Sequence, residues 1–195
     1  MEFENKLVVI ESPSKKYLSV ITTGQEFVTN EGKIEFNKIT SLPIRLESSI
    51  GTTFLIYVPS YKEFILLMKR GPQIIYPKDV GSIVVSANLN SHSKVLEIGT
   101  GSGALTLFIS SLLGPNSEFY SVDVNKKNQY RAKKTISRYI SNYSEEMTKK
   151  VNFINEDIST FSLESISVSF DSIITDVPEP WHFFSNNKIK HNLFW

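Results

Sequence analysis

Three glycines at alternate positions, Gly99, Gly101 and Gly103, follow an apolar run that ends in Glu97 and Ile98. Because glycine has no side chain, it lets a strand turn tightly into a helix while the backbone comes close to a ligand. The N–H groups at the start of that helix then favour an anionic group. The stretch predicts a strand, a loop and a helix around a nucleotide-like cofactor. The alternative is a tight turn that binds nothing.

The spacing of the glycines and a later aspartate narrow the class of cofactor. A dehydrogenase fingerprint places its third glycine one residue further on, so this spacing, with Glu97 ahead of it, favours S-adenosylmethionine over NAD. Asp123 ends the next apolar run, about twenty residues later, where a carboxylate can accept both ribose hydroxyls of an adenosine. NAD enzymes share that feature, and Asp123 could also cap the helix that follows.

Asp157 follows the third predicted strand, counted from the apolar run before the glycines, in Asn155-Glu156-Asp157. At this position an acidic side chain could accept a hydrogen bond from an adenine amino group. It could equally cap the next turn, and both interpretations stay open.

Asp176 stands where the last predicted strand leaves the sheet, in Asp176-Val177-Pro178-Glu179-Pro180-Trp181. The two prolines fix φ and remove two hydrogen-bond donors, so the segment is expected to be stiff and extended. Trp181 adds a surface for stacking. We expect this segment to shape a pocket in which Asp176 takes part in the chemistry. The alternative is a rigid strand exit with a packed tryptophan.

Two further features suit a nucleic-acid substrate. Tyr76 could stack on a flipped base or hydrogen-bond to it, although a tyrosine half-buried at an interdomain seam fits as well. Lys127, Arg131, Lys134 and Arg138 share one face of a predicted basic helix and could contact phosphates. A solvated helix face is the commoner explanation of such a pattern.

The bulk composition excludes several classes of protein. The 195 residues are 41% hydrophobic with a formal net charge of +1, so a core can form and the charge alone does not indicate nucleic-acid binding. The absence of cysteine rules out disulfides and Cys-ligated zinc or iron–sulfur sites, and the three histidines show no metal-ligand spacing. No apolar run is long enough to cross a bilayer. The acidic start of the chain resembles neither a signal peptide nor an Arg-rich transit peptide.

The order of the predicted elements indicates two domains. Short apolar runs separated by turn residues predict a small, barrel-like β domain over residues 1–72. From residue 73 strands alternate with helices, which predicts an α/β domain with a Rossmann-like parallel sheet over 73–195 and ligands beyond the carboxyl ends of its strands. The predicted strands are 7–10, 17–22, 26–29, 34–36, 53–58, 94–98, 118–124, 151–155 and 170–175, and the predicted helices are 61–68, 77–87, 104–113 and 126–139.

Together these residues resemble the catalytic subunit of the tRNA (adenine-58-N1)-methyltransferases, which are class I S-adenosylmethionine-dependent enzymes. The resemblance covers most of the chain, and its more specific parts are residues 73–79 (Gln-Ile-Ile-Tyr-Pro-Lys-Asp) and 176–181. It implies transfer of a methyl group from S-adenosylmethionine to N1 of adenine 58 in the T-loop of tRNA. Asp176 would then be the catalytic residue, stabilising the positive charge of the product.

The resemblance also implies site residues, partners and a compartment. Asn128 stands where relatives often have an arginine near the cofactor. Family members work as tetramers, either of one subunit or of catalytic and RNA-binding subunits, without a membrane or a metal, and the expected compartment is the nucleus, the cytoplasm or the mitochondrion. The implied cofactor-binding residues are Ile75, Gly99, Gly101, Ser102, Gly103, Ala104, Asp123, Asn128, Asp157, Ile158 and Asp176, and those implied for the base are Tyr76, Pro178 and Trp181.

The end of the chain leaves alternatives open. Relatives continue with a helix and three more strands, whereas this chain stops at Trp195 and residues 186–192 do not look like that helix. The domain is therefore expected to be truncated after its fourth strand, with 170–175 as an uncovered edge. The alternatives are a non-catalytic fragment that binds tRNA or a partner subunit, and a class I methyltransferase that acts on a protein or a small molecule.

Overall fold

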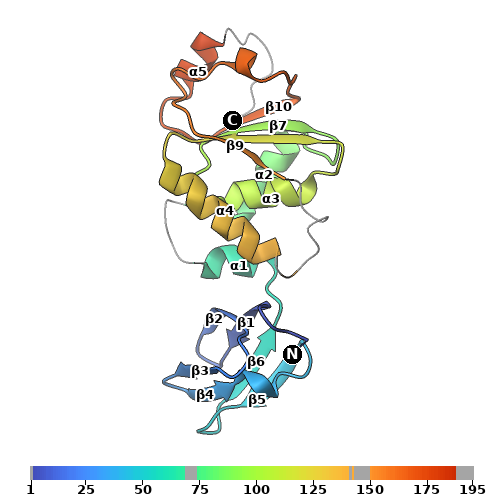
Figure 1. Cartoon of the computed structure of the whole chain (residues 1–195), viewed down its shortest axis with the longest axis vertical. Coiled ribbons are helices and arrows are strands. Elements are labelled where there is room, and N and C mark those ends of the chain that lie inside the picture. The colour runs from blue at the N-terminus through green and yellow to red at the C-terminus, as the bar shows by residue number, and fades with distance from the viewer. Residues whose placement is uncertain (1, 69–73, 141, 143–149, 188–195) are drawn as a thin grey trace. The chain divides into compact units, whose positions relative to one another are not determined.

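The computed structural model describes residues 2–68, 74–140, 142 and 150–187. It divides into two units, Met1–Lys69 with Ser141–Ser144 and Arg70–Ile140 with Glu145–Trp195 (Figure 1). The domain boundary expected at residues 72 and 73 lies outside the described residues. Among the described helices, none is both long enough and apolar enough to span a membrane.

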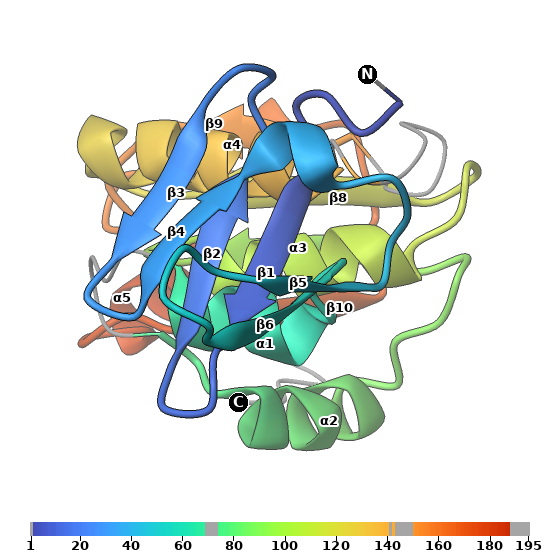
Figure 2. The same ribbon diagram turned by 90° about the horizontal axis from the view of Figure 1, so that it is seen from below.

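The N-terminal unit is built from antiparallel strands (Figure 2). Four of them form one sheet in the order β2-β1-β6-β5, and β3 and β4 form a separate hairpin. β2 and β5 are therefore the two edges of the larger sheet. The expected small β domain is confirmed as an antiparallel sheet with a separate hairpin. The strands are β1 (Leu7–Glu11), β2 (Lys16–Val20), β3 (Glu26–Thr29), β4 (Gly32–Glu35), β5 (Ile44–Glu47) and β6 (Thr53–Tyr57).

One strand of this unit was not predicted. β5 has a half-buried, alternating pattern of apolar and charged residues that is typical of an edge strand, but it is short and directly follows Pro43. The predicted strand 34–36 ends at Glu35, because Phe36–Lys38 forms a 3-10 turn, labelled η1. Helix α1 (Tyr61–Leu67) lies within the predicted range and begins with a capping box between Ser60 and Glu63.

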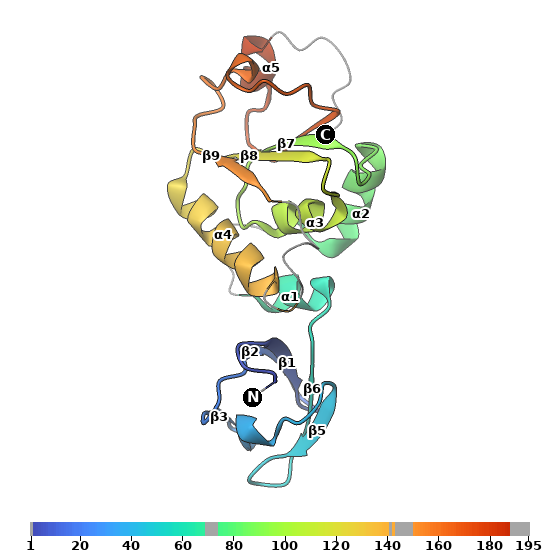
Figure 3. The ribbon, with the colours of Figure 1, turned by 45° about the vertical axis from the view of Figure 1, so that its right-hand side comes forward.

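The C-terminal unit is a parallel sheet covered by helices (Figure 3). The strand order β10-β7-β8-β9 places the first strand between the second and the last, so the order reverses beside β7. Helices α2, α3 and α4 lie on one side of the sheet and α5 on the other (Figures 1 and 3). The elements are α2 (Pro77–Ser86), β7 (Lys94–Ile98), α3 (Ala104–Leu112), β8 (Glu118–Val122), α4 (Lys126–Ile140), β9 (Asn152–Ile154), β10 (Ser172–Thr175) and α5 (Trp181–Asn186), with a 3-10 turn η3 at Leu163–Ser165.

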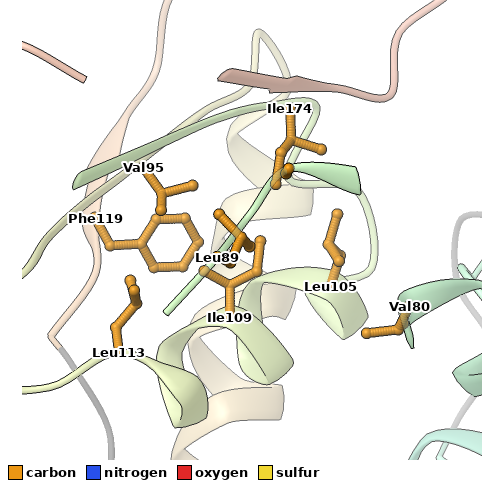
Figure 4. Packing of buried hydrophobic residues seen from close by; sticks show 9 residues of the cluster. Val80, Leu89, Val95, Leu105, Ile109, Leu113, Phe119 and Ile174 are labelled. Atoms are coloured by element: carbon orange, nitrogen blue, oxygen red, sulfur yellow. The ribbon is translucent and has the colours of Figure 1, made fainter. Parts of the chain in front are cut away.

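Alternate residues of the strands supply two cores, as the strand period of two requires. Figure 4 shows Val95 and Phe119 of the sheet packed with Leu105 and Ile109 of α3. On the opposite face the buried residues are Leu96, Ile98, Val122, Phe161 and Phe183. Burial on both faces is typical of a parallel sheet and confirms the predicted α/β class.

Helix α5 begins at Trp181, where the segment predicted to be stiff and extended after Asp176 ends. Pro180 lies at the N-cap of the helix. Phe183 is fully buried in the core on that face of the sheet. The segment is therefore stabilised by a tertiary contact, which its two prolines do not reveal.

Candidate cofactor and substrate site

A cavity of about 1180 Å³ lies at the carboxyl ends of the parallel strands. Its walls come from residues just beyond β7, β8, β9 and β10 and from the start of α2. In open parallel sheets, ligands bind at this end and beside the strand where the order reverses. The predicted site residues that line it are Ile75, Tyr76, Gly99, Gly101, Asp123, Asn128, Asp157, Ile158, Asp176 and Pro178.

A second cavity, of about 440 Å³, lies at the opposite end of the sheet. Its lining residues include His92, which lies before β7, Asp171, which precedes β10, and Ser172, which begins β10. None of the predicted site residues lines it. The larger cavity is therefore the candidate site.

Four predicted site residues do not line the larger cavity: Ser102, Gly103, Ala104 and Trp181. The first three are buried at the start of α3, whereas 55% of the Trp181 surface is exposed. Of the three glycines, only Gly99 and Gly101 thus line the cavity. A Cβ on Gly103 would lie 2.6 Å from the Ala132 Cβ, so this glycine allows α3 to pack closely against α4.

Gly99 likewise serves a close contact between two segments of backbone. A Cβ there would overlap the carbonyl oxygen of Asp176, and the Asp176 N–H donates to the Ile98 carbonyl at 2.8 Å. Around Gly101, by contrast, the nearest atom to an added Cβ would be 3.9 Å away. Of the three glycines, Gly101 is the one with open space at the cavity.

Asp123 connects the end of β8 to the glycine loop. Its Oδ2 accepts hydrogen bonds from the Gly101 N–H at 3.0 Å and the Asn128 amide at 3.3 Å. Its Oδ1 accepts from the Asn125 N–H at 2.7 Å, beside the start of α4. The residue that caps α4 is Asn125 rather than Asp123, because the Asn125 Oδ1 accepts from the Lys127 N–H at 2.9 Å.

Glu97 lies beneath the glycine loop and is buried, with 1% of its surface exposed. Its Oε2 accepts from the hydroxyls of Thr106 at 2.7 Å and Ser121 at 2.6 Å, and the Ser121 hydroxyl lies 2.6 Å from that of Thr100. Oε1 has no hydrogen-bond partner among the described residues. Burial raises the pKa of Glu97 to about 8, against the effect of these hydrogen bonds, and the nearby Asp176 carboxylate adds to the rise.

Asp157 caps the turn after β9 and also faces the cavity. Its Oδ1 accepts from the Ser159 hydroxyl at 2.7 Å and the Ser159 N–H at 2.8 Å, and these two hydrogen bonds lower its pKa. The structure therefore shows the capping contact that the sequence left as one of two alternatives.

The rim beyond β10 carries polar and aromatic side chains. Asp176 is exposed and lines the cavity together with Pro178, Glu179 and His182. The His182 Nε2 lies 3.7 Å from the Glu179 carboxylate, and the Trp181 and His182 rings are 6.1 Å apart. Trp181 thus lies next in sequence to a lining residue without lining the cavity itself.

Sequence reasoning missed several residues that line the cavity. Most of them adjoin predicted ones, as Asn125 and Glu156 do, so their positions beside the strand ends were the available signal. No cluster of His, Asp or Glu in the described ranges is arranged to hold a metal ion. The missed lining residues are Ile74, Asp79, Ile83, Ile98, Val122, Val124, Asn125, Glu156, Ser159, Val177, Glu179 and His182.

The chain is similar in sequence to tRNA methyltransferases. The chain is 28% identical to a tRNA (adenine(57)-N(1)/adenine(58)-N(1))-methyltransferase TrmI of Methanocaldococcus jannaschii, over 95% of this chain and 71% of that protein. It is 24% identical to the tRNA (adenine(58)-N(1))-methyltransferase TrmI of Thermus thermophilus, over 93% of this chain and 69% of that protein.

Solved structures agree with this similarity. The tRNA (m1A58) methyltransferase TrmI of Aquifex aeolicus superposes with a TM-score of 0.72 at 28% identity, covering 94% of this chain and 69% of that one. An S-adenosylmethionine-dependent O-methyltransferase of Thermotoga maritima superposes with a TM-score of 0.80 at 22% identity, covering 93% of this chain and 66% of that one. The similarity to the Thermotoga maritima protein shows the fold alone, because the two sequences are only 22% identical.

The family model of the tRNA methyltransferase complex GCD14 subunit matches residues 55–192. This range covers most of the chain and includes the glycine loop, Asp123 and the Asp176 segment. The chain therefore belongs to the family of the tRNA methyltransferase complex GCD14 subunit.

Proposed function

We propose that this protein transfers a methyl group from S-adenosylmethionine to N1 of adenine 58 in tRNA. The observation that carries the proposal is the meeting of Gly101, Asp123 and Asp176 around one cavity at the carboxyl end of the sheet. Family membership and the similarity to TrmI proteins support it.

The residues around the cavity fit an adenosine-containing cofactor. Ile75 and Ile158 offer apolar surface for an adenine ring, and Asp123 offers carboxylate oxygens for ribose hydroxyls. Gly101 leaves room beside the backbone, since no atom other than its neighbours comes closer than 3.9 Å to an added Cβ. S-adenosylmethionine, when bound, supplies an electrophilic methyl group.

Asp176 suits the part of the reaction that takes place on the adenine base, which accepts the methyl group. Methylation at N1 leaves a positive charge on the adenine ring, and a carboxylate close to the exocyclic amine stabilises that charge. Asp176 is exposed at the cavity, and its backbone is hydrogen-bonded to Ile98. In the proposal Tyr76 and Pro178 bound the base, and Trp181 offers an exposed ring at the rim.

We further propose that the protein acts as part of an oligomer, with copies of itself or with a second, RNA-binding subunit. The similar proteins of Dictyostelium discoideum and Yarrowia lipolytica are called catalytic subunits. The nucleus, the cytoplasm and the mitochondrion are the compartments proposed for this activity.

The test is transfer of a labelled methyl group to unmodified tRNA and to tRNA in which adenine 58 is replaced. Label should enter only the first, and Asp176→Ala should slow transfer by about 100-fold or more. Calorimetric binding of S-adenosylhomocysteine should stay within about threefold of the parent value, because Asp176 acts on the base.

Two outcomes would contradict the proposal. Equal labelling of both tRNAs would exclude adenine 58 as the target. Equal loss of transfer and of S-adenosylhomocysteine binding in Asp176→Ala would remove the catalytic role of this residue, and Asp176→Asn separates the effect of charge from that of hydrogen bonding.

A further inference from the structure

Helix α4 concentrates the positive charge of this chain. Six of the 21 Lys and Arg residues lie on its 15 positions, whereas none of the 20 Asp and Glu residues does. The rest of the chain therefore has more acids than bases, although the formal net charge is +1. Like charges on one helix repel one another, and a nearby anion reduces this repulsion.

The charges lie on the side of α4 that faces away from the sheet. Gln129, Ala132, Ile136 and Tyr139 are its buried residues, and with 3.6 residues per turn they form one stripe. Lys127, Arg131, Lys134 and Arg138 repeat at the same spacing on the opposite side, and all four are exposed. We call these four residues the outer face of α4.

Most cations of this helix have no acidic partner in the described ranges. Lys126, Lys127, Arg131, Lys133 and Lys134 form no ion pair there, whereas some lysines elsewhere do, such as Lys33 with Glu26 and Lys38 with Glu35. Lys134 instead lies 4.7 Å from the centre of the Tyr130 ring, which is 60% exposed, and Lys133 lies 5.1 Å from that of Phe153.

The helix starts at the proposed active site. Asn125 and Asn128 line the large cavity, and Lys126 and Lys127 lie between them in sequence. From there 15 residues extend for about 22 Å at 1.5 Å per residue. The positive end of the helix dipole adds to the charge at the cavity.

We propose that the outer face of α4 binds tRNA phosphates next to the nucleotide whose base enters the cavity, an inference that rests on the proposed function. Lysine and arginine contacts to phosphates supply the sequence-independent part of RNA affinity. The exposed Tyr130 ring adds a surface on which a base can stack. An anionic membrane fits less well, because the apolar side of the helix is buried in the protein core.

The experiment compares tRNA binding by two triple variants over a series of salt concentrations. In the first, Lys127, Arg131 and Lys134 become Ala; in the second, exposed Lys15, Lys33 and Lys38 of the N-terminal unit become Ala, with the same change of net charge. The first should weaken tRNA binding at least tenfold at 0.15 M salt. It should also reduce the magnitude of the negative slope of log K against log salt by about two. The second should change affinity less than threefold.

Two controls separate this inference from folding defects and from the proposed function. Exchanging Lys and Arg at positions 127, 131 and 134 keeps the charge and should keep tRNA affinity within about threefold. S-adenosylhomocysteine binding should be unchanged in every variant. If the parent protein binds tRNA through α4 but does not methylate adenine 58, the proposed function fails and this inference stands.

Equal weakening by the two triple variants would overturn the inference, since net charge alone would then explain binding. Unchanged tRNA affinity in the first variant would overturn it as well, while methyl transfer could continue. Vesicles of phosphatidylserine and phosphatidylcholine provide a third arm. Binding to them that equals tRNA binding and depends on the same three residues would assign the outer face to membranes instead.

Discussion

At the residue scale, the buried carboxyl group of Glu97 is the most unusual feature of the site. It joins β7, β8 and α3 through the hydroxyls of Ser121 and Thr106. With a pKa of about 8, it holds a proton at neutral pH. A neutral acid fits this environment, because a buried charge would need compensation that the unpartnered Oε1 does not receive.

Glu97→Gln should therefore flatten the dependence of stability on pH. The folded pKa of about 8 exceeds the ordinary value of 4.5, so the contribution of this group is fully present below pH 4.5 and is lost as pH rises to 8. Thermal unfolding from pH 5 to 8.5 should show the parent protein losing Tm relative to the variant. Exposed Glu164→Gln serves as the control, and parallel curves for the parent and Glu97→Gln would refute the protonated state.

Asp123→Ala should weaken cofactor binding strongly and leave the protein folded. The substitution removes the acceptor for Gly101 and Asn128 and the carboxylate proposed for ribose. We expect S-adenosylhomocysteine affinity to fall at least tenfold, because charge-assisted hydrogen bonds are worth about 1.5–3 kcal/mol. Calorimetric titration measures this, and Asp171→Ala is the matched control, since its carboxylate accepts the Lys94 N–H at the other end of the sheet. Equal loss in both variants would contradict the assignment.

At the element scale, the close packing of α3 on α4 depends on Gly103. Its φ of +78° disfavours other residues, and a Cβ would meet the Cβ and Cα of Ala132 at 2.6 and 2.7 Å. Gly103→Ala should destabilise the C-terminal unit by about 2–4 kcal/mol, combining backbone strain with overpacking.

Gly101→Ala provides the comparison within the same unit. Its φ is also positive, at +52°, but no neighbouring atom lies closer than 3.9 Å to the added Cβ. Only the backbone term of about 1 kcal/mol is then expected. Urea unfolding of both variants without cofactor measures the difference, and equal losses would show that the contact with Ala132 is unimportant.

In the N-terminal unit, a cluster of four side chains attaches α1 to the sheet. The Tyr57 hydroxyl lies 2.6 Å from Glu63 and 2.8 Å from Glu11, and Lys16 contacts both carboxylates. Burial works to raise the pKa of Glu63, but hydrogen bonds from Tyr57, Ser60 and Lys16 outweigh it and lower the pKa to about 2.

Glu63→Gln should consequently weaken the acid sensitivity of this unit. A lowered carboxyl pKa contributes stability above pH 4.5 that is lost as pH falls toward 2. Hydrogen exchange of β1 and β6 between pH 2.5 and 5, corrected for intrinsic rates, should show a steeper loss of protection in the parent protein. Exposed Glu47→Gln is the control, and a variant as acid-sensitive as the parent would contradict the role of Glu63.

At the scale of the whole molecule, the two units have separate hydrophobic cores. All residues that line the candidate site belong to the C-terminal unit. A ligand stabilises the part of a protein whose folded state it binds. S-adenosylhomocysteine should therefore protect one unit selectively.

We expect S-adenosylhomocysteine at 100 times its Kd to stabilise the C-terminal unit by about 2.7 kcal/mol. Amide exchange through global opening should slow about 100-fold in β7, β8 and α3. Exchange in β1 and β6 of the N-terminal unit should stay unchanged. Hydrogen-exchange mass spectrometry separates these segments, and equal protection of both units would show that their folding is coupled.

The sequence by itself determined the α/β class, most elements and the residues at the strand ends. Local signals suffice there: apolar runs predict β7 and β8, Pro77 predicts the start of α2, and the glycines predict the turn before α3. A parallel sheet brings the carboxyl ends of its strands to one edge. Hence Gly101, Asp123 and Asp176 could be expected around one cavity before the structure was known.

Only the tertiary structure decided which of those residues line the cavity and which pack in the protein interior. Gly103 packs against Ala132 instead of lining the cavity, and Phe183 stabilises a short helix that begins directly after the two prolines and was not predicted. The proton on Glu97 likewise depends on burial between β8 and α3. Close approach, burial and desolvation arise between segments that are distant in sequence, and for this reason local patterns do not contain them.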